Sequence, residues 1–255
     1  LLIFYLSVFG IKTTKFNNQV KKQISETNKK INIDLRNIKI TLSLFDLKAN
    51  ITTLNTRILF NNKKIKLESL KSKVSLLALF KNQFSIDNLQ LASRFVKVKD
   101  LVSFIRVLNN DQRLFLLEMM IKDGYLEGSI NLNFDKKGKV KNDFKIDGAV
   151  KNLKIKILKN YNLDNLNFVF NIKDKKYKFS QIETQLNKIK LNSPAITIEK
   201  KNNLFFIDGK ILNEKKDISF DKIKNLLAKY YPDLNLKEIN FTSDNNFSFE
   251  VNKKF

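Results

Sequence analysis

Apolar and polar residues alternate with a period of two along most of the chain, and Lys, Asn, Asp, Ser or Thr usually occupies the polar positions. A strand with this pattern turns one face to an apolar environment and the other to water. The alternating runs lie at 31–35, 38–44, 65–67, 84–86, 130–134, 144–146, 153–157, 166–172, 177–179, 189–191, 196–198 and 247–251. They predict a mainly β protein built on one long, mostly antiparallel sheet. A one-residue bulge at Arg36-Asn37 would keep the first two runs on the same side.

Two segments depart from this alternation and predict helices. In residues 99–121, the apolar side chains of Leu101, Phe104 and Leu108 fall at helical spacing. In residues 214–232, a second stripe begins near Phe220, and Pro232 would end it. The sequence therefore predicts a helical insertion at 99–121 and a helix at 214–232, two short interruptions of the sheet.

A short phrase of the form apolar-x-x-apolar-x-apolar recurs at residues 35–40, 86–91, 163–168 and 236–241. Its first step of three residues predicts a turn or bulge at the entry to a strand. An Ile-Asp-Gly sequence recurs at 146–148 and 207–209, where glycine would let a strand bend. These echoes predict loosely repeated strand units, with a β-groove region at 12–98 and a β-repeat region at 122–213. Residues 233–255 would begin a further β unit, truncated at its end.

The first eleven residues, LLIFYLSVFGI, are uncharged and almost wholly apolar. They fit either the end of a transmembrane anchor or the apolar region of a cleaved signal peptide. We favour residues 1–11 as the end of a truncated, N-terminal transmembrane helix, because no A-x-A-like cleavage site follows them.

Composition changes this picture in two ways. The 22 Phe and the 43% apolar content supply enough material for a folded protein, whereas the six Gly argue against a fold built on tight turns. The formal charge is +23, but only five of the 48 basic residues are Arg, and Lys is spread along the polar faces of the predicted strands. Recognition of nucleic acid favours Arg for its bidentate contacts, so we expect no nucleic-acid partner.

The candidate chemistry of the chain is sparse. His and Cys are missing from the sequence, which excludes catalytic triads and the usual zinc sites. Ser219 and Lys222 have the spacing of a serine acyl-enzyme motif, but they are better explained as the start of the second helix. Asp143 and Asp147 alternate with lysines as a solvated charge pattern, and Asp123, Glu127 and Asp135 lack the spacing of a metal loop. We therefore expect no enzyme activity, no cofactor and no metal.

The apolar face of the predicted sheet is the informative feature, because the predicted helices are too short to cover it. Either the sheet rolls on itself around a core, or it curls into an open groove with an apolar lining. An apolar groove in an anchored protein would suit acyl chains. The candidate groove residues are Ile38, Ile40, Leu42, Phe168, Phe170, Ile196 and Ile198.

The run INIDLRNIKITL at 31–42, the run IKLESLKSKVSLLALF at 65–80 and the run FSIDNLQL at 84–91 resemble the amino-terminal region of the AsmA/TamB-like family of bacterial envelope proteins. The Ile-Asp-Gly strands are similar to that family's repeats, and the resemblance covers about residues 1–213. It implies a protein held in the bacterial inner membrane by one anchor, with most of the chain in the periplasm. It also implies phospholipid movement toward the outer membrane and a contribution to outer-membrane assembly.

Two other functions remain open. An envelope scaffold could pair its exposed strand edges with outer-membrane barrel proteins. A basic protein could bind nucleic acid, in which case its affinity would fall steeply with salt.

Overall fold

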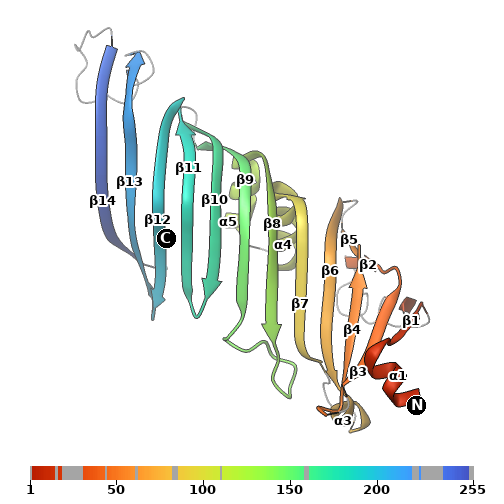
Figure 1. The fold of residues 1–255 in the computed structure, drawn as a ribbon. Helices are drawn as coiled ribbons and strands as arrows, with labels where there is room; N and C mark the ends of the chain where they lie inside the picture. Colours follow the sequence, from red (N-terminus) through yellow and green to blue (C-terminus); the bar gives the residue numbers. More distant parts are fainter. Residues whose placement is uncertain are drawn as a thin grey trace. The chain divides into compact units, whose positions relative to one another are not determined.

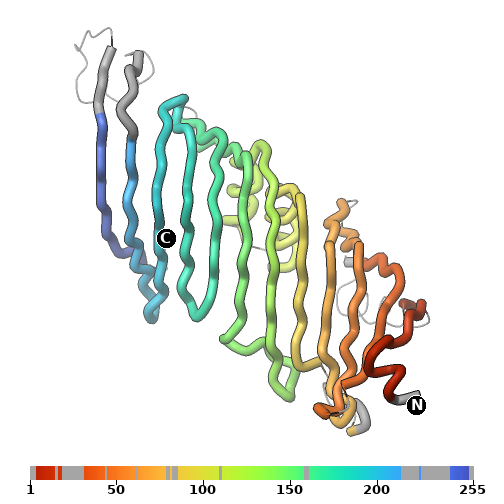
Figure 2. The backbone as a smooth tube through the Cα atoms, viewed as in Figure 1, coloured from red at the N-terminus to blue at the C-terminus, as the bar shows by residue number. Residues whose placement is uncertain are grey.

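The structure is a computed structural model whose backbone is traced in Figure 2. It describes residues 2–14, 17–18, 31–43, 45–60, 63–81, 86–109, 111–157, 161–219, 224 and 238–252.

The described strands form one long, open antiparallel sheet, as the alternation predicts (Figure 1). Hydrogen-bonded neighbours follow the order β1-β3-β4-β6-β7-β8-β9-β10-β11-β12-β13-β14, and β5 joins β2 to β6 beside this path. The strands are β1 (Ile11–Thr13), β2 (Ile31–Asp34), β3 (Ile38–Ser43), β4 (Lys48–Leu54), β5 (Arg57–Phe60), β6 (Lys63–Ser75), β7 (Ile86–Lys97), β8 (Ile121–Asn133), β9 (Lys145–Ile157), β10 (Tyr161–Lys173), β11 (Lys176–Leu186), β12 (Ile189–Lys201), β13 (Leu204–Ser219) and β14 (Glu238–Asn252).

The chain divides into two compact units. Unit 1 comprises residues 1–96 and 126–147, and unit 2 comprises residues 97–125 and 148–255.

The strand register of unit 1 explains why the alternation gives a sheet with one apolar face and one polar face. Ile40 of β3 pairs with Ile51 of β4, whereas the neighbouring Lys39 pairs with Thr52. The same separation continues from β4 into β6, where Ala49 pairs with Val74 and Asn50 pairs with Lys73. Apolar residues thus gather on one face of the sheet and polar residues on the other.

The buried cluster of unit 1 lies where β2 meets β3. Ile33, Leu35 and Ile38 are almost fully buried, and Ile40, Ile51 and Leu70 pack against them. The bulge expected at Arg36-Asn37 is wrong, because the chain changes partners there. β2 pairs with β5, whereas β3 pairs with β1 and β4, so the one-residue shift in the pattern marks a break between two strands.

Unit 2 is a meander in which β10 to β14 pair in sequence order (Figure 1). Two-residue turns connect β10 to β11 at Asp174-Lys175 and β11 to β12 at Asn187-Lys188, and all four residues have positive φ. These are the dihedrals of a type I′ hairpin turn, in which Asn and Asp are well tolerated. The expectation that scarce glycine excludes tight turns is therefore wrong.

Bulges interrupt several of the long strands. Asn165, inside the 163–168 copy of the repeated phrase, has φ 51° and lies at a register shift of β10 against β11. A second shift occurs within the 86–91 copy, between the pairs of Lys73 and Val74. The predicted bulge is thus confirmed in these two copies.

Pro194 lies inside β12 opposite Gln181, whose φ is 53°. The pairing of β12 is irregular on both sides of Pro194, and this irregularity accommodates the missing N–H of proline.

The first predicted helical segment is confirmed as the hairpin of α4 (Val98–Asn109) and α5 (Gln112–Met120). Asp111 caps α5 by accepting the Arg113 backbone N–H, and Arg106 of α4 forms an ion pair with Glu118 of α5 at 2.9 Å. The second prediction differs from the structure, because residues 214–219 continue β13 as a strand. Apart from Lys224, the remainder of 214–232 lies outside the described residues.

At the N-terminus, α1 (Leu2–Val8) is seven residues long and packs beside β3, and the short helix α3 (Leu76–Phe80) packs beside β4 and β6. A search of the described residues finds no helix of sufficient length and apolar character to span a bilayer. The expected transmembrane anchor at residues 1–11 is therefore not supported by the structure.

Candidate functional site

Two rows of apolar side chains cross five strands of unit 2 on the same face. Cross-strand register aligns the members of each row, and residues two apart along a strand share a face. We call them the apolar rows. The first contains Ile172, Tyr177, Ile198, Ile207 and Phe249, and the second contains Phe170, Phe179, Ile196, Gly209 and Phe247.

Aromatic rings contact one another in T-shaped and tilted pairs at the two ends of these rows. The Phe168 ring lies 5.7 Å from that of Phe179 in a T-shaped arrangement and 6.2 Å from that of Phe170. At the other end, the rings of Phe247 and Phe249 lie 5.9 Å apart. The rows therefore form a continuous apolar surface from β10 to β14.

Gly209 makes room for one of these rings. A Cβ at position 209 would lie 2.5 Å from Cζ of Phe247 and 3.0 Å from Cγ1 of Ile196. The recurring Ile-Asp-Gly sequence predicts a bend in the strand, but at residues 207–209 the missing side chain makes room for ring packing.

Replacing Gly209 by Ala is therefore expected to displace the Phe247 ring and to destabilise unit 2 by about 1–2 kcal/mol. Urea denaturation would measure this change, and Lys210→Ala, on the next residue of β13, is the comparison. A Gly209→Ala variant as stable as the parent would show that the ring does not depend on this space.

The apolar rows are only partly covered. Phe170 is 9% exposed and Phe249 is 50% exposed, while the other side chains of the rows are half-buried. The opposite face of the same strands is polar, with Lys178 paired to Thr197 and Thr197 to Asp208. In a sheet folded around a core, phenylalanine and isoleucine rows at the centre would be almost fully buried. The apolar face of unit 2 is instead partly accessible.

The predicted groove residues divide between the two units. Phe168, Phe170, Ile196 and Ile198 lie together on the accessible face of unit 2. Ile38, Ile40 and Leu42 lie on β3 of unit 1, where Ile38 is 3% exposed within the buried cluster and the other two are half-buried. Ile38 is thus placed as a core residue of unit 1.

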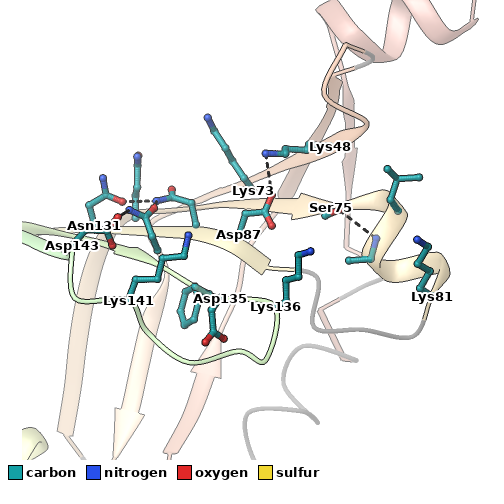
Figure 3. A pocket seen from close by; sticks show the side chains of 16 residues that line it. Lys48, Lys73, Ser75, Lys81, Asp87, Asn131, Asp135, Lys136, Lys141 and Asp143 are labelled. Atoms are coloured by element: carbon teal, nitrogen blue, oxygen red, sulfur yellow. Dashed lines mark hydrogen bonds and ion pairs between the residues drawn. The ribbon is translucent and has the colours of Figure 1, made fainter.

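A cavity of about 950 Å³ on the polar face of unit 1 was missed by the sequence reasoning (Figure 3). Residues of β4, β6, α3, β7 and the segment from Asn131 to Asp143 line it. Its lysines are Lys48, Lys73, Lys81, Lys136 and Lys141, and its carboxylates are Asp87, Asp135 and Asp143.

One side of this cavity is held by the amide of Asn88 on β7. Its Nδ2 donates to Oδ1 of Asn131 at 2.5 Å and to Oδ1 of Asn133 at 2.8 Å. The backbone N–H of Phe134 donates to the carbonyl oxygen of Asp87 at 3.0 Å. These bonds join β7 to the segment that carries Lys136 and Lys141.

That segment is a turn built around Asp135. Oδ1 of Asp135 accepts the backbone N–H of Lys137 at 2.8 Å and of Lys139 at 2.9 Å, and Gly138 takes the left-handed conformation that closes the turn. The Lys139 hydrogen bond, followed by the Lys137 bond and the nearby lysine charges, lowers the pKa of Asp135 below its ordinary value.

The turn should consequently lose its order in acid. Because the pKa of Asp135 is lower in the folded state, its contribution to stability is present above pH about 4 and is lost as pH falls through the lowered folded value. The amide resonances of Lys137 and Lys139, followed by NMR through this range, should shift with that midpoint. Asp135→Asn should abolish the shift; a shift unchanged in this variant would contradict the assignment.

The described residues hold no group of three or more Asp, Glu, His or Cys side chains arranged to bind a metal ion. Comparison with protein-family models, with curated proteins and with solved structures gives no match.

Proposed function

We propose that the protein binds the acyl chains of phospholipids on the apolar rows of unit 2, without enzymatic activity. The observation that carries this proposal is the partial accessibility of the rows, which leave apolar side chains incompletely covered on each of five adjacent strands. Five strands spaced about 4.8 Å apart give a surface about 19 Å wide. Exposed apolar surfaces of this extent mark interaction sites in soluble proteins.

The free energy available on this surface is adequate for reversible binding. Each methylene removed from water contributes about 0.8 kcal/mol, so ten methylenes laid along the rows would contribute about 8 kcal/mol before ordering costs. That value corresponds at most to micromolar affinity, which suits a protein that must also release its lipid.

We propose further that the protein works in the bacterial envelope, held at the inner membrane with most of its chain in the periplasm. The resemblance to AsmA/TamB-like proteins supports this location, and so does the apolar character of residues 1–11. In this setting a sheet curled into a groove would conduct phospholipid and contribute to outer-membrane lipid homeostasis and assembly.

Lipid capture by the complete 255-residue chain tests the proposal. Protein purified from a bacterial host should carry phospholipid detectable by mass spectrometry, and it should take up a fluorescent phospholipid after delipidation. A folded protein that neither retains nor takes up lipid would contradict acyl-chain binding.

One observation, the sequence of β14, favours the alternative function of an envelope scaffold that pairs strands with barrel proteins. β14 is the last strand in the described order, and its 15 residues include neither Lys nor Pro, which commonly protect sheet edges. Crosslinks from β14 to a barrel protein, with no lipid on the apolar rows, would favour strand pairing over acyl-chain binding.

A further inference from the structure

We propose that the lysine-lined cavity of unit 1 binds a phosphate group, carried either by a soluble phosphoester or by a phospholipid head. This site lies on the polar face of unit 1, whereas the acyl-chain proposal concerns the apolar rows of unit 2. The two proposals therefore succeed or fail separately.

The charges of the cavity are unbalanced. Lys48 forms an ion pair with Asp87 at 3.0 Å, Asp143 accepts a hydrogen bond from Asn133, and Asp135 is occupied by backbone N–H groups of its turn. Among the described residues, no carboxylate lies within ion-pair distance of Lys73, Lys81, Lys136 or Lys141, although the charge of Lys141 acts on Asp135 at longer range. Although the three aspartates offset part of the lysine charge, the lining keeps an excess of two positive charges, and a bound anion would relieve the repulsion among the ammonium groups.

The cavity also contains neutral hydrogen-bond donors, and one side of it is fixed in place by hydrogen bonds. Ser75 Oγ accepts the backbone N–H of Ala78 at 3.3 Å, which leaves its own proton available to a ligand, and the Gln90 amide lies on the same polar face. The Asn88 hydrogen bonds hold the segment of Lys136 and Lys141 against β7. A volume of about 950 Å³ is large enough for a phosphoester with its attached group.

Phosphate fits this donor set better than other anions do. Lysine binds phosphate as a point charge without the fixed planar geometry that carboxylates share with arginine, and the cavity contains no Arg. The five lysines and three aspartates of the lining leave a net charge of +2, which matches the charge of one phosphate group and falls short of the charge of a long polyanion. A compact phosphate group is therefore the ligand that matches the arrangement.

Calorimetric titration of the complete chain with inorganic phosphate and with glycerol 3-phosphate tests the site. The double variant Lys73→Gln/Lys141→Gln should bind at least about tenfold more weakly, since it removes two charged contacts. Lys154→Gln/Lys178→Gln removes the same charge from exposed positions of unit 2 and should leave affinity within about twofold. All four lysines are exposed, so circular dichroism should show every variant folded.

The source of the phosphate is distinguished by sedimentation with phosphatidylglycerol vesicles. If inorganic phosphate releases the protein from vesicles and the Lys73/Lys141 variant fails to sediment, the group belongs to a lipid head. If vesicle binding is the same in both double variants, a soluble phosphoester is the ligand. Absence of saturable phosphate binding, or an equal loss in the unit 2 control, would overturn the site.

Discussion

Replacing Phe179 by Asp is expected to reduce phospholipid occupancy at least about tenfold while leaving the sheet folded. Phe179 lies in the middle of the second apolar row, between Phe170 and Ile196, and packs against the Phe168 ring. A carboxylate there would have to be desolvated by an acyl chain, at a cost of several kcal/mol that the chain does not compensate. The free protein avoids most of this cost because position 179 is only partly buried and water can reach the carboxylate.

Lys178→Asp is the matched control, because Lys178 precedes Phe179 on β11 and faces the polar side. It changes the charge by two, whereas Phe179→Asp changes it by one. A general electrostatic effect on anionic lipid would thus be larger in the control. Mass spectrometry of co-purified phospholipid measures both variants, and equal occupancy in Phe179→Asp and the parent would exclude the apolar rows as the lipid site.

Ile38→Asp is expected to have the largest effect on stability, with a loss of about 3–5 kcal/mol and unfolding of unit 1. Ile38 is 3% exposed and packs in the cluster with Ile33 and Leu35, so its carboxylate would be buried without a partner. Hydrogen exchange should show lost protection in β3, β4 and β6. Lys39→Asp, one residue along on the exposed face, should remain within about 0.5 kcal/mol of the parent.

Phe168→Asp provides the comparison between the units. Phe168 is half-buried on the accessible face, so this variant should remain folded and lose lipid, unlike Ile38→Asp. Loss of the fold in both variants would mean that the apolar rows are an ordinary core, and acyl-chain binding would then be withdrawn.

The alternation of period two was sufficient to predict most strands, because a register between antiparallel neighbours preserves the separation of faces. The pattern separates the runs at 144–146 and 153–157, but residues 145–157 form the single strand β9, and the runs at 189–191 and 196–198 both belong to β12. Local irregularities at Asn152 and Pro194 interrupted the pattern without ending the strand. Periodicity alone does not distinguish a bulge from a loop.

The tight turns were missed because glycine is their usual signal. At Asp174-Lys175 and Asn187-Lys188 the strands on either side impose the left-handed conformation, and Asp and Asn tolerate it at small cost. The pattern places residues 214–219 in a helix because they precede a helical stripe, whereas pairing of residues 216–219 with β14 holds this segment in a strand.

The candidate sites were predictable to different degrees. Phe168, Phe170, Ile196 and Ile198 follow from alternation, since their shared face needs only the strand period and antiparallel pairing. The lysine-lined cavity does not, because its residues come from separate elements and lysine is frequent throughout the chain. The Asp-Lys-Lys-Gly turn at 135–138 was the one local signal that could have suggested an ordered loop there.

The meander of unit 2 has a consequence for how the protein is made. From β10 to β13 each strand pairs with the next along the chain through a two-residue turn, so the pairing partners are close in sequence. Low contact order of this kind allows each hairpin to form as soon as it leaves the ribosome, without waiting for a distant segment. Every newly added strand covers the unpaired edge of the one before it, so the growing end of the sheet would expose only its latest strand to aggregation at each stage of synthesis.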